Sequence, residues 1–461
     1  MASVPSGTRV EATVLRMLGP QGSLFELFLP AGMRVLSGEL AEIDAVLDDP
    51  RFFAPFIPFF SRTDGRPSIP IETYLRLMFL KTRHGLGYER LVVQVTDSLS
   101  LRRFCRIGLE TPVPNESTIR KLTARLGPDL VDELNRLLLT AANERTPLAI
   151  DRVRVDTTVV EANIKYPTDS GLLTKAISRI AVQLTRVNTA GLPVVFVDRT
   201  TQARAFQHSI GAWLRRRSDE AKTEVLAITG LLADLAELSV TEAMKALHGK
   251  GRRRRPVRRL LDKLAVLIER TVQVIEQARS RAGGTQPPGA TRLVSLHEPD
   301  ARPISKGQLG KGTQFGFKAQ VADNADGIIL DYSVHIGNPS DTGLLRPAIE
   351  RITTLTGVPG LVTADRGYWD ANIEHDLTTT GVTTVVIPRT GKASKARATI
   401  EQATEFVTAV KWRTGSEGRI SHLKRDCGWR RTHLRRHDGA RIWCAHGVFA
   451  HNLVKLTRLQ R

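Results

Sequence analysis

Cysteine, long apolar runs and acidic residues are all scarce in this chain of 461 residues. Its three cysteines, Cys105, Cys427 and Cys444, are too few and too scattered for a disulfide framework, which favours a reducing compartment. No stretch approaches the roughly 18 apolar residues that a transmembrane helix needs. The first residues lack the basic start, apolar core and cleavage site of an export signal. These absences exclude a membrane-spanning protein and favour a cytoplasmic location.

The shortage of acids leaves the chain strongly basic. There are 67 lysines and arginines against 47 aspartates and glutamates, a formal charge of +20. Hydrophobic content of 41% and charged content of 25% are ordinary for a folded protein, which excludes wholesale disorder. At roughly 100–200 residues per domain, the length suggests two to four domains. Positive charge indicates a nucleic-acid partner, although many basic proteins merely have solvated faces.

The cations concentrate in two segments. Residues 411–461 hold 13 lysines and arginines against three acids. The run RRRRPVRR, between two helix-like stretches, begins with Arg252, Arg253, Arg254 and Arg255. A solvated turn would explain this run, but such density is self-repulsive without counter-charge nearby. We therefore predict that these four arginines contact DNA phosphates.

The N-terminal part divides into a segment without an assigned role, residues 1–68, and a predicted helical domain, residues 69–146. In that domain IETYLRLMFLKTRHG has apolar residues at nearly a 3.6 period, a second amphipathic helix follows, and a third begins after Asn115 as N-cap. Short helices that end in a basic one resemble a helix-turn-helix unit, whose last helix reads the major groove. Arg120 and Lys121 are then predicted DNA contacts, although any three-helix bundle has this pattern.

Residues 147–426 alternate between strand and helix patterns around a long helical insertion at residues 171–300. A strand, LAIDRVRVDTTVV, precedes the insertion, and a hairpin with its turn at 324–327 follows it. Then come a helix, the strand GLVTAD, a helix, the strand VTTVVIP and a last helix at about 411–425. This is the order of an RNase H-like α/β fold with a mixed five-stranded sheet. Residues 427–461 are predicted to be a basic C-terminal tail of this catalytic domain.

Three acids converge in that topology. Asp156 lies on the first strand, Asp365 at the carboxyl end of the fourth, where open sheets place their ligand sites, and Glu417 on the last helix. Carboxylates from distant parts of a chain suit Mg²⁺, which prefers hard oxygen ligands. A pair of ions roughly 3.5–4 Å apart serves phosphodiester chemistry. Alone, either aspartate would more often be structural, but the set predicts a metal-dependent site.

Two cations accompany Glu417 in the sequence. Arg413 lies four residues before it and Lys424 seven after, so at about 100° per residue all three would share one helix face. Arg413 and Glu417 would then form either a surface ion pair worth a few tenths of a kcal/mol or part of a site in which both cations bind phosphates.

The segments VRVDTTVVEANIKYPTDSGLL, LVTADRGYWD and GSEGRISHLKR resemble the three catalytic motifs of DDE transposases from bacterial insertion sequences. The closest resemblance is to the superfamily of the IS-four and IS-five elements and their IS-1182-like or unclassified-family relatives. The family's metal-binding acids fall on Asp156, Asp365 and Glu417. Its Tyr-Arg-Glu-Lys signature falls on Arg413, Glu417 and Lys424, with Val410 in place of the tyrosine. The similar regions cover roughly residues 69–170 and 310–455.

The resemblance implies an enzyme that binds the terminal inverted repeats of its element. Mg²⁺, as two ions or with Mn²⁺ as a substitute, would support strand cleavage by water and strand transfer by the freed 3′-OH. The implied partners are double-stranded DNA of the element ends and target, and a second copy of the chain in a homodimer, with no membrane. Two alternatives remain: a catalytically silent, domesticated DNA-binding protein and a stand-alone RNase H-like nuclease.

The basic C-terminal segment also holds several histidines and cysteines. His433 and His437 have the H-x₃-H spacing of zinc sites, and further possible ligands lie nearby: Cys427, Cys444, His446 and His451. A zinc module usually has a C-x₂-C pair, which is absent, so buried or phosphate-contacting side chains are the default interpretation. Trp429 among its neighbouring arginines would either stack on a base or pack in the core.

Overall fold

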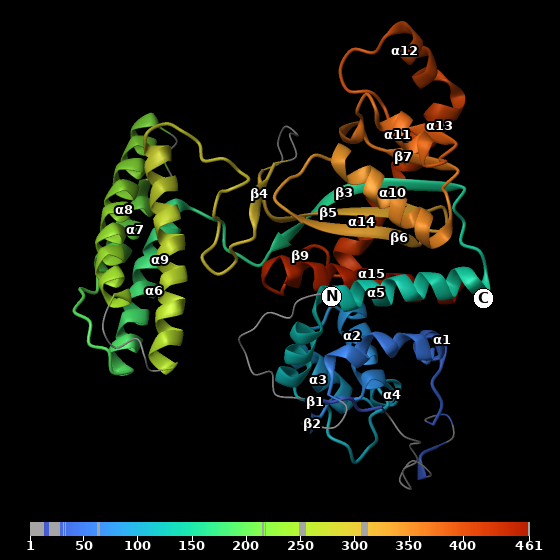
Figure 1. Ribbon diagram of the computed structural model, residues 1–461, viewed down its shortest axis with the longest axis horizontal. Helices are drawn as coiled ribbons and strands as arrows, with labels where there is room; N and C mark the ends of the chain where they lie inside the picture. The colour runs from blue at the N-terminus through green and yellow to red at the C-terminus, as the bar shows by residue number, and fades with distance from the viewer. Residues whose placement is uncertain are drawn as a thin grey trace.

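The computed structural model describes residues 13–17, 28–30, 32, 34–61, 65–213, 216, 218–248, 255–305 and 312–459. They form a helical N-terminal region, a mixed sheet covered by helices, and a separate bundle of helices that projects to one side (Figure 1). In these described ranges, no helix has both the length and the apolar character needed to cross a membrane.

The central sheet has the strand order β6-β5-β3-β7-β8, with β4 also on β5 and β9 also on β3. Strand β5 runs antiparallel to β3 and β6, whereas β7 and β8 continue parallel to β3. The strands are β3 (Arg152–Ala162), β4 (Arg302–Ile304), β5 (Gln314–Asn324), β6 (Ile329–Ile336), β7 (Leu361–Ala364), β8 (Thr384–Val386) and β9 (Arg431–Thr432). The five predicted strands thus have the order and directions of an RNase H-like sheet, and two short strands extend the described sheet to seven.

The predicted hairpin turn lies where the sequence placed it. The amide of Gly327 donates to the carbonyl of Asn324, and the amide of Ile328 donates to the Asn324 side chain. Gly327 has φ +79°, and a Cβ there would lie 1.9 Å from the guanidinium of Arg419. Glycine is therefore required by both the left-handed backbone and the close approach of the arginine.

Five helices connect and flank the parallel strands and lead into the C-terminal part: α10 (Thr342–Thr356), α11 (Ile373–Thr379), α12 (Lys395–Gln402), α13 (Thr404–Arg413) and α14 (Gly415–Asp426). The single helix predicted over about 411–425 is wrong: the chain forms two helices that meet at Thr414. The amide of Glu417 donates to the Thr414 carbonyl in a tight turn, which separates Arg413 from the helix that carries Glu417. The face that these residues were predicted to share therefore does not belong to one helix.

In the residues that the structure describes, the N-terminal region has helices, the two-residue strands β1 (Thr13–Val14) and β2 (Arg66–Pro67), and no longer strand. Its helices are α1 (Gly38–Leu47), α2 (Ile71–Arg83), α3 (Tyr88–Asp97), α4 (Leu99–Phe104) and α5 (Glu116–Arg145), with short 3₁₀ turns at Pro50–Phe52 and Ala54–Phe59. Asn115 caps α5 by accepting from the Ser117 amide, as predicted. Ile43, Phe52 and Phe56, from the segment without an assigned role, are buried in the same core as α2 and α5.

The C-terminal segment is a core helix and not the basic tail that the sequence suggested. Helix α15 (Arg436–Leu459) packs against α5, α2 and β6, so it joins the helical N-terminal region to the sheet. Ala440, Cys444 and Leu453 are each 0% exposed. One continuous apolar core therefore runs from α1 through α15 to strands β3 and β7.

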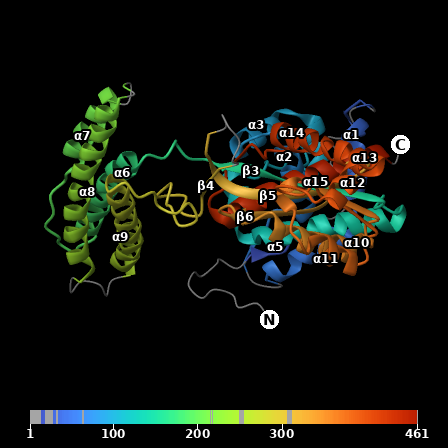
Figure 2. The same ribbon diagram turned by 90° about the horizontal axis from the view of Figure 1, so that it is seen from above.

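The predicted insertion folds as four helices around its own core: α6 (Asp169–Thr189), α7 (Thr200–Trp213), α8 (Asp219–Leu247) and α9 (Arg255–Ala282). Ile177, Leu232 and Leu264 are among its buried residues. Figure 2 shows the bundle standing beside the sheet, with the chain entering it after β3 and returning from it to β4. The insertion therefore leaves the order of the central strands undisturbed.

Candidate active site

Asp156 lies within β3, and Asp365 directly follows the neighbouring parallel strand β7. In the register of β3 and β7, Val155 lies opposite Ala364, and both side chains are fully buried. Side chains alternate between the two faces along an extended chain. Asp156 follows Val155 and Asp365 follows Ala364, so both acids project to the opposite face of the sheet from these buried residues. The sequence prediction that these two acids come together is consistent with this register.

The electrostatics of Asp365 reflect a crowded group of negative charges. Burial, then the charge of Asp156, then that of Asp341, raise the pKa of the Asp365 carboxyl above its ordinary value. A hydrogen bond from the Gly367 amide to Asp365, 2.9 Å long, opposes this effect. Two ionised carboxylates held this way repel each other, and a divalent cation between them would relieve that repulsion.

Asp156 is held by the junction between α13 and α14. The hydroxyl of Ser416 donates to Asp156 Oδ2 at 2.7 Å, and Arg413 Nη1 lies 3.5 Å from the same oxygen. The amide of Thr157 donates to the other carboxylate oxygen at 2.8 Å. The start of α14 therefore lies against the first catalytic-motif strand, and Arg413 lies beside Asp156 rather than beside Glu417.

Glu417 follows Ser416 and lies in the first turn of α14, with its side chain exposed. Within the described ranges its carboxylate makes no hydrogen bond or ion pair. The oxygens of Asp156, Asp365 and Glu417 do not all lie within 4.8 Å of one another among the described residues. The structure therefore places Asp156 and Asp365 close together. Glu417 is next in sequence to Ser416, which contacts Asp156, but the Glu417 carboxylate does not join the two aspartates in one cluster.

A buried ion network fixes this junction to the sheet, and the sequence analysis missed it. Arg154, two residues before Asp156, makes a double hydrogen bond to Asp323 on β5 at 2.8 and 2.9 Å. Arg419 on α14 binds the same carboxylate at 3.0 Å, and Arg154 also donates to the Trp412 carbonyl. A Cβ on Gly415 would lie 2.3 Å from Arg154, so this glycine makes room for the guanidinium. The one hint of the network in the sequence is strand alternation, which puts Arg154 on the same face of the sheet as Asp156.

The other predicted DNA contacts are dispersed. Arg120 and Lys121 are exposed on α5, Arg255 is exposed at the start of α9, and Lys424 is half-buried on α14. Arg252, Arg253 and Arg254 lie outside the described residues. Arg120 lines a cavity of about 930 Å³ between the α2–α3 turn and the end of α14. The other lysines and arginines of this cavity are Lys81, Arg83, Arg90, Arg425, Arg430 and Arg431.

The two alternatives for the C-terminal aromatic and histidine residues are resolved by packing. Trp429 is 0% exposed and donates to the Cys444 carbonyl at 3.1 Å, so it is a core residue and not a base-stacking platform. His437 contacts the Val334 carbonyl at 2.7 Å. His433 and His437 do not join a metal-sized group of ligands in the described part of the chain.

Comparison with known families finds a match for two segments of the chain. Residues 33–125 match a family described as a transposase domain, DUF772, and residues 273–453 match the transposase DDE domain. The chain belongs to the DDE transposases. This transposase is 31% identical over 147 residues to "Uncharacterized protein ORF8 in nfe locus" of Rhizobium meliloti. The matched region covers 31% of this chain and 70% of that relative. No solved structure matches it.

The DDE-domain match includes Asp365 and Glu417 but begins within α9, after Asp156. The helical insertion separates the first strand from the rest of the domain, and the sheet register brings β3 back beside β7. The transposase thus has a catalytic domain of the metal-dependent DDE type, and a divalent ion and DNA are the expected cofactor and partner of such an enzyme.

The crowded carboxylates predict a stability change at Asp365. Because the pKa of Asp365 is raised in the folded protein, the unfolded chain releases the Asp365 proton at a lower pH than the folded protein does. The free energy of unfolding therefore falls as the pH rises from the ordinary pKa to the raised one. Asp365→Asn removes the charge and is expected to raise the melting temperature without metal at pH 7 by roughly 1–3 °C. Thermal unfolding with and without Mg²⁺ tests this, because Mg²⁺ should stabilise the wild type more than the variant. An equal Mg²⁺ response in both proteins would contradict the assignment.

Proposed function

We propose that this transposase binds the terminal inverted repeats of its element, cleaves the DNA strand there and transfers the freed 3′ end into target DNA. The observation that carries the proposal is the pairing of Asp156 and Asp365 on adjacent strands, with Ser416 of α14 hydrogen-bonded to Asp156. That contact supports a site in which Glu417, the next residue, completes the set of acids. The binding-only alternative does not explain why Asp156 and Asp365 are held so close that the charge of one raises the pKa of the other.

The donor set fits Mg²⁺, as one or two ions. Asp156, Asp365 and Glu417 would hold the metal through hard carboxylate oxygens, and the proximity of the first two acids is otherwise unfavourable. When bound, such ions polarise the scissile phosphodiester and activate the attacking oxygen. Ser416 and the Thr157 amide orient the Asp156 carboxylate, and the Gly367 amide orients that of Asp365. No side-chain nucleophile is required.

The cations beside the acids fit DNA phosphates. Arg413 Nε is buried and has no hydrogen-bond partner among the described residues, while Nη1 lies 3.5 Å from Asp156. A DNA phosphate is an acceptor that would satisfy this nitrogen. Lys424 lies on α14 about two turns after Glu417. Arg120 and Lys121 are exposed cations on α5. Arg252–Arg255 would hold DNA at a distance from the site, and a homodimer would pair two element ends.

A strand-transfer assay tests the function. A plasmid that carries the inverted repeats found beside the gene is incubated with the protein and Mg²⁺, and products are separated by size. We expect joined molecules that EDTA abolishes. A pure DNA-binding protein would give a mobility shift without product, and a stand-alone nuclease would cleave without joining. Either of these results would overturn the proposal.

A further inference from the structure

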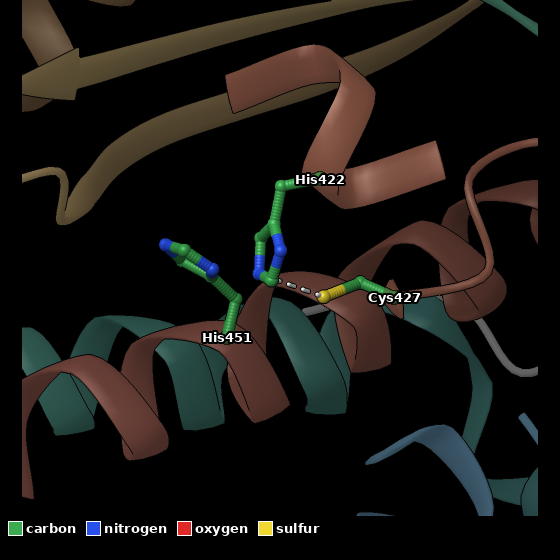
Figure 3. Close-up of side chains that lie close together, drawn as sticks. All are labelled: His422, Cys427 and His451. Atoms are coloured by element: carbon green, nitrogen blue, oxygen red, sulfur yellow. Dashed lines mark hydrogen bonds between the residues drawn. The ribbon is translucent and has the colours of Figure 1, made fainter. Parts of the chain in front are cut away.

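A second group of metal-binding side chains lies away from the carboxylates, between α14 and α15. His422 is on α14, Cys427 directly follows that helix, and His451 is on α15. One ligand atom from each residue lies within 4.8 Å of the others, and Cys427 Sγ is 3.9 Å from His422 Nε2. Figure 3 shows the three side chains lying close together, with the His422 ring between the Cys427 sulfur and the His451 ring. Cys427 and His451 are 5% and 3% exposed.

Both histidines are oriented by a second contact. His422 Nδ1 lies 2.7 Å from Asp426, a carboxylate that accepts its proton, so Nε2 keeps its lone pair toward Cys427. His451 Nε2 lies 2.9 Å from the Gly327 carbonyl, which can only accept, so its Nδ1 keeps a lone pair. Arg419 is further from that nitrogen, at 3.5 Å, and does not reverse this assignment. Histidines that ligate zinc are held in this way by carboxylates and carbonyls.

We propose that His422 Nε2, Cys427 Sγ and His451 Nδ1 bind one Zn²⁺ ion. Thiolate and imidazole ligands select zinc over magnesium, which distinguishes this site from the carboxylates. Tetrahedral zinc with bonds of about 2.0–2.3 Å separates its ligand atoms by roughly 3.4–3.6 Å. The observed separations, 3.9 Å for one pair and at most 4.8 Å for the others, therefore need to shrink by up to roughly 1.4 Å. A cavity of about 530 Å³ adjoins all three residues and leaves room for water as the fourth ligand.

The charges around the cavity are partly balanced by carboxylates. The cavity is lined by Arg83, Arg419, Arg458 and Lys455, and each of the three arginines has a carboxylate partner. Asp426 adds a negative charge at His422. Arg83 and Arg458 share Glu39, and Arg419 shares Asp323 with Arg154, so the cations around the cavity are only partly balanced. A zinc ion with one thiolate ligand would add a single net positive charge to them.

The position of the site gives the ion a role as a structural clip. It would tie α14 to α15, and the His451 contact with Gly327 extends the connection to the β5–β6 turn. His422 follows Glu417 by five residues, about 140° around the helix at 100° per residue. The clip would thus hold one side of α14 and leave the side that bears Glu417 free.

Zinc content and cobalt spectroscopy of the full-length protein test the inference. We expect about one zinc per chain, and with Co²⁺ the visible bands of a tetrahedral ion together with a thiolate-to-cobalt charge-transfer band. Cys427→Ser should lose the charge-transfer band, and His451→Gln should lose the bound ion. Cys444→Ser is the matched control, because Cys444 is equally buried on α15 and lies outside the cluster. It should keep both signals.

Two further measurements keep the outcome decisive. Circular dichroism identifies any variant that does not fold. Alkylation by iodoacetamide then reports whether the Cys427 thiol is bound in the folded wild type, because zinc should protect it until a chelator is added. Asp156→Asn should retain zinc and the cobalt bands, which makes the inference independent of catalysis. A wild type that binds neither Zn²⁺ nor Co²⁺, or a folded Cys427→Ser variant with an unchanged charge-transfer band, would overturn it.

Discussion

Replacing Asp156 or Asp365 with asparagine, or Glu417 with glutamine, is expected to reduce Mg²⁺-dependent strand cleavage by about 10³-fold or more. Each amide keeps the size of the side chain but removes an anionic oxygen ligand. A metal site contributes several kcal/mol of transition-state stabilisation, and about 4 kcal/mol corresponds to a factor of 10³. Cleavage of a labelled element end, measured at saturating protein, reports the loss, while a mobility shift reports whether the end is still bound.

Glu161→Gln is the matched control for these variants. Glu161 lies on β3 as Asp156 does, but it pairs with Arg431 at 2.9 Å and lies near the far end of the strand. Its replacement is expected to change cleavage by less than about threefold, because a half-exposed pair contributes little. If the three acid variants cleaved as fast as Glu161→Gln, the assignment of the active site would be wrong.

The largest expected effect on stability is at Asp323, and Asp323→Ala should lower the free energy of unfolding by about 3–5 kcal/mol. The Asp323 carboxylate is 3% exposed and accepts from Arg154 and Arg419 together. Its removal leaves one buried and one largely buried guanidinium without their shared counter-charge. Breaking a buried ion network on one side is far more unfavourable than losing a surface pair.

Denaturant unfolding measures this change, with Glu350→Ala as its control. Glu350 pairs with Arg346 on α10, and both side chains are about half exposed, so we expect a change below about 1 kcal/mol. Because the network attaches α14 to the sheet, a folded Asp323→Asn variant should also cleave more slowly than the wild type. Equal stability losses for Asp323→Ala and Glu350→Ala would contradict the structural role given to the network.

Local patterns were sufficient for much of the fold. Alternating valines mark β3, the turn residues around Gly327 mark the hairpin, and Asn115 marks the start of α5. These signals work because strand alternation, left-handed turns and helix caps depend on nearby residues. The acids Asp156 and Asp365 could be predicted in the same way, since one lies on a recognisable strand and the other directly follows one.

Features that depend on distant contacts could not be predicted. The segment that forms α15 is rich in cations, a composition that predicts a basic tail. It is buried because α5, α2 and β6 all pack against it. The break at Thr414 accompanies the contacts that Arg154 and Asp156 make with that junction. The H-x₃-H spacing drew attention to His433 and His437, whereas the side chains that meet are His422, Cys427 and His451.

The central claim is that the carboxylates of this transposase hold a divalent ion, and Mn²⁺ binding to the complex with an element end tests it most directly. Mn²⁺ prefers oxygen ligands, so the loss of its free EPR signal reports the carboxylate site rather than the His–Cys cluster. The wild type and Glu161→Gln are expected to bind Mn²⁺ alike, and Asp156→Asn and Asp365→Asn to bind it at least about tenfold more weakly. Equal Mn²⁺ binding by all four proteins would contradict the claim.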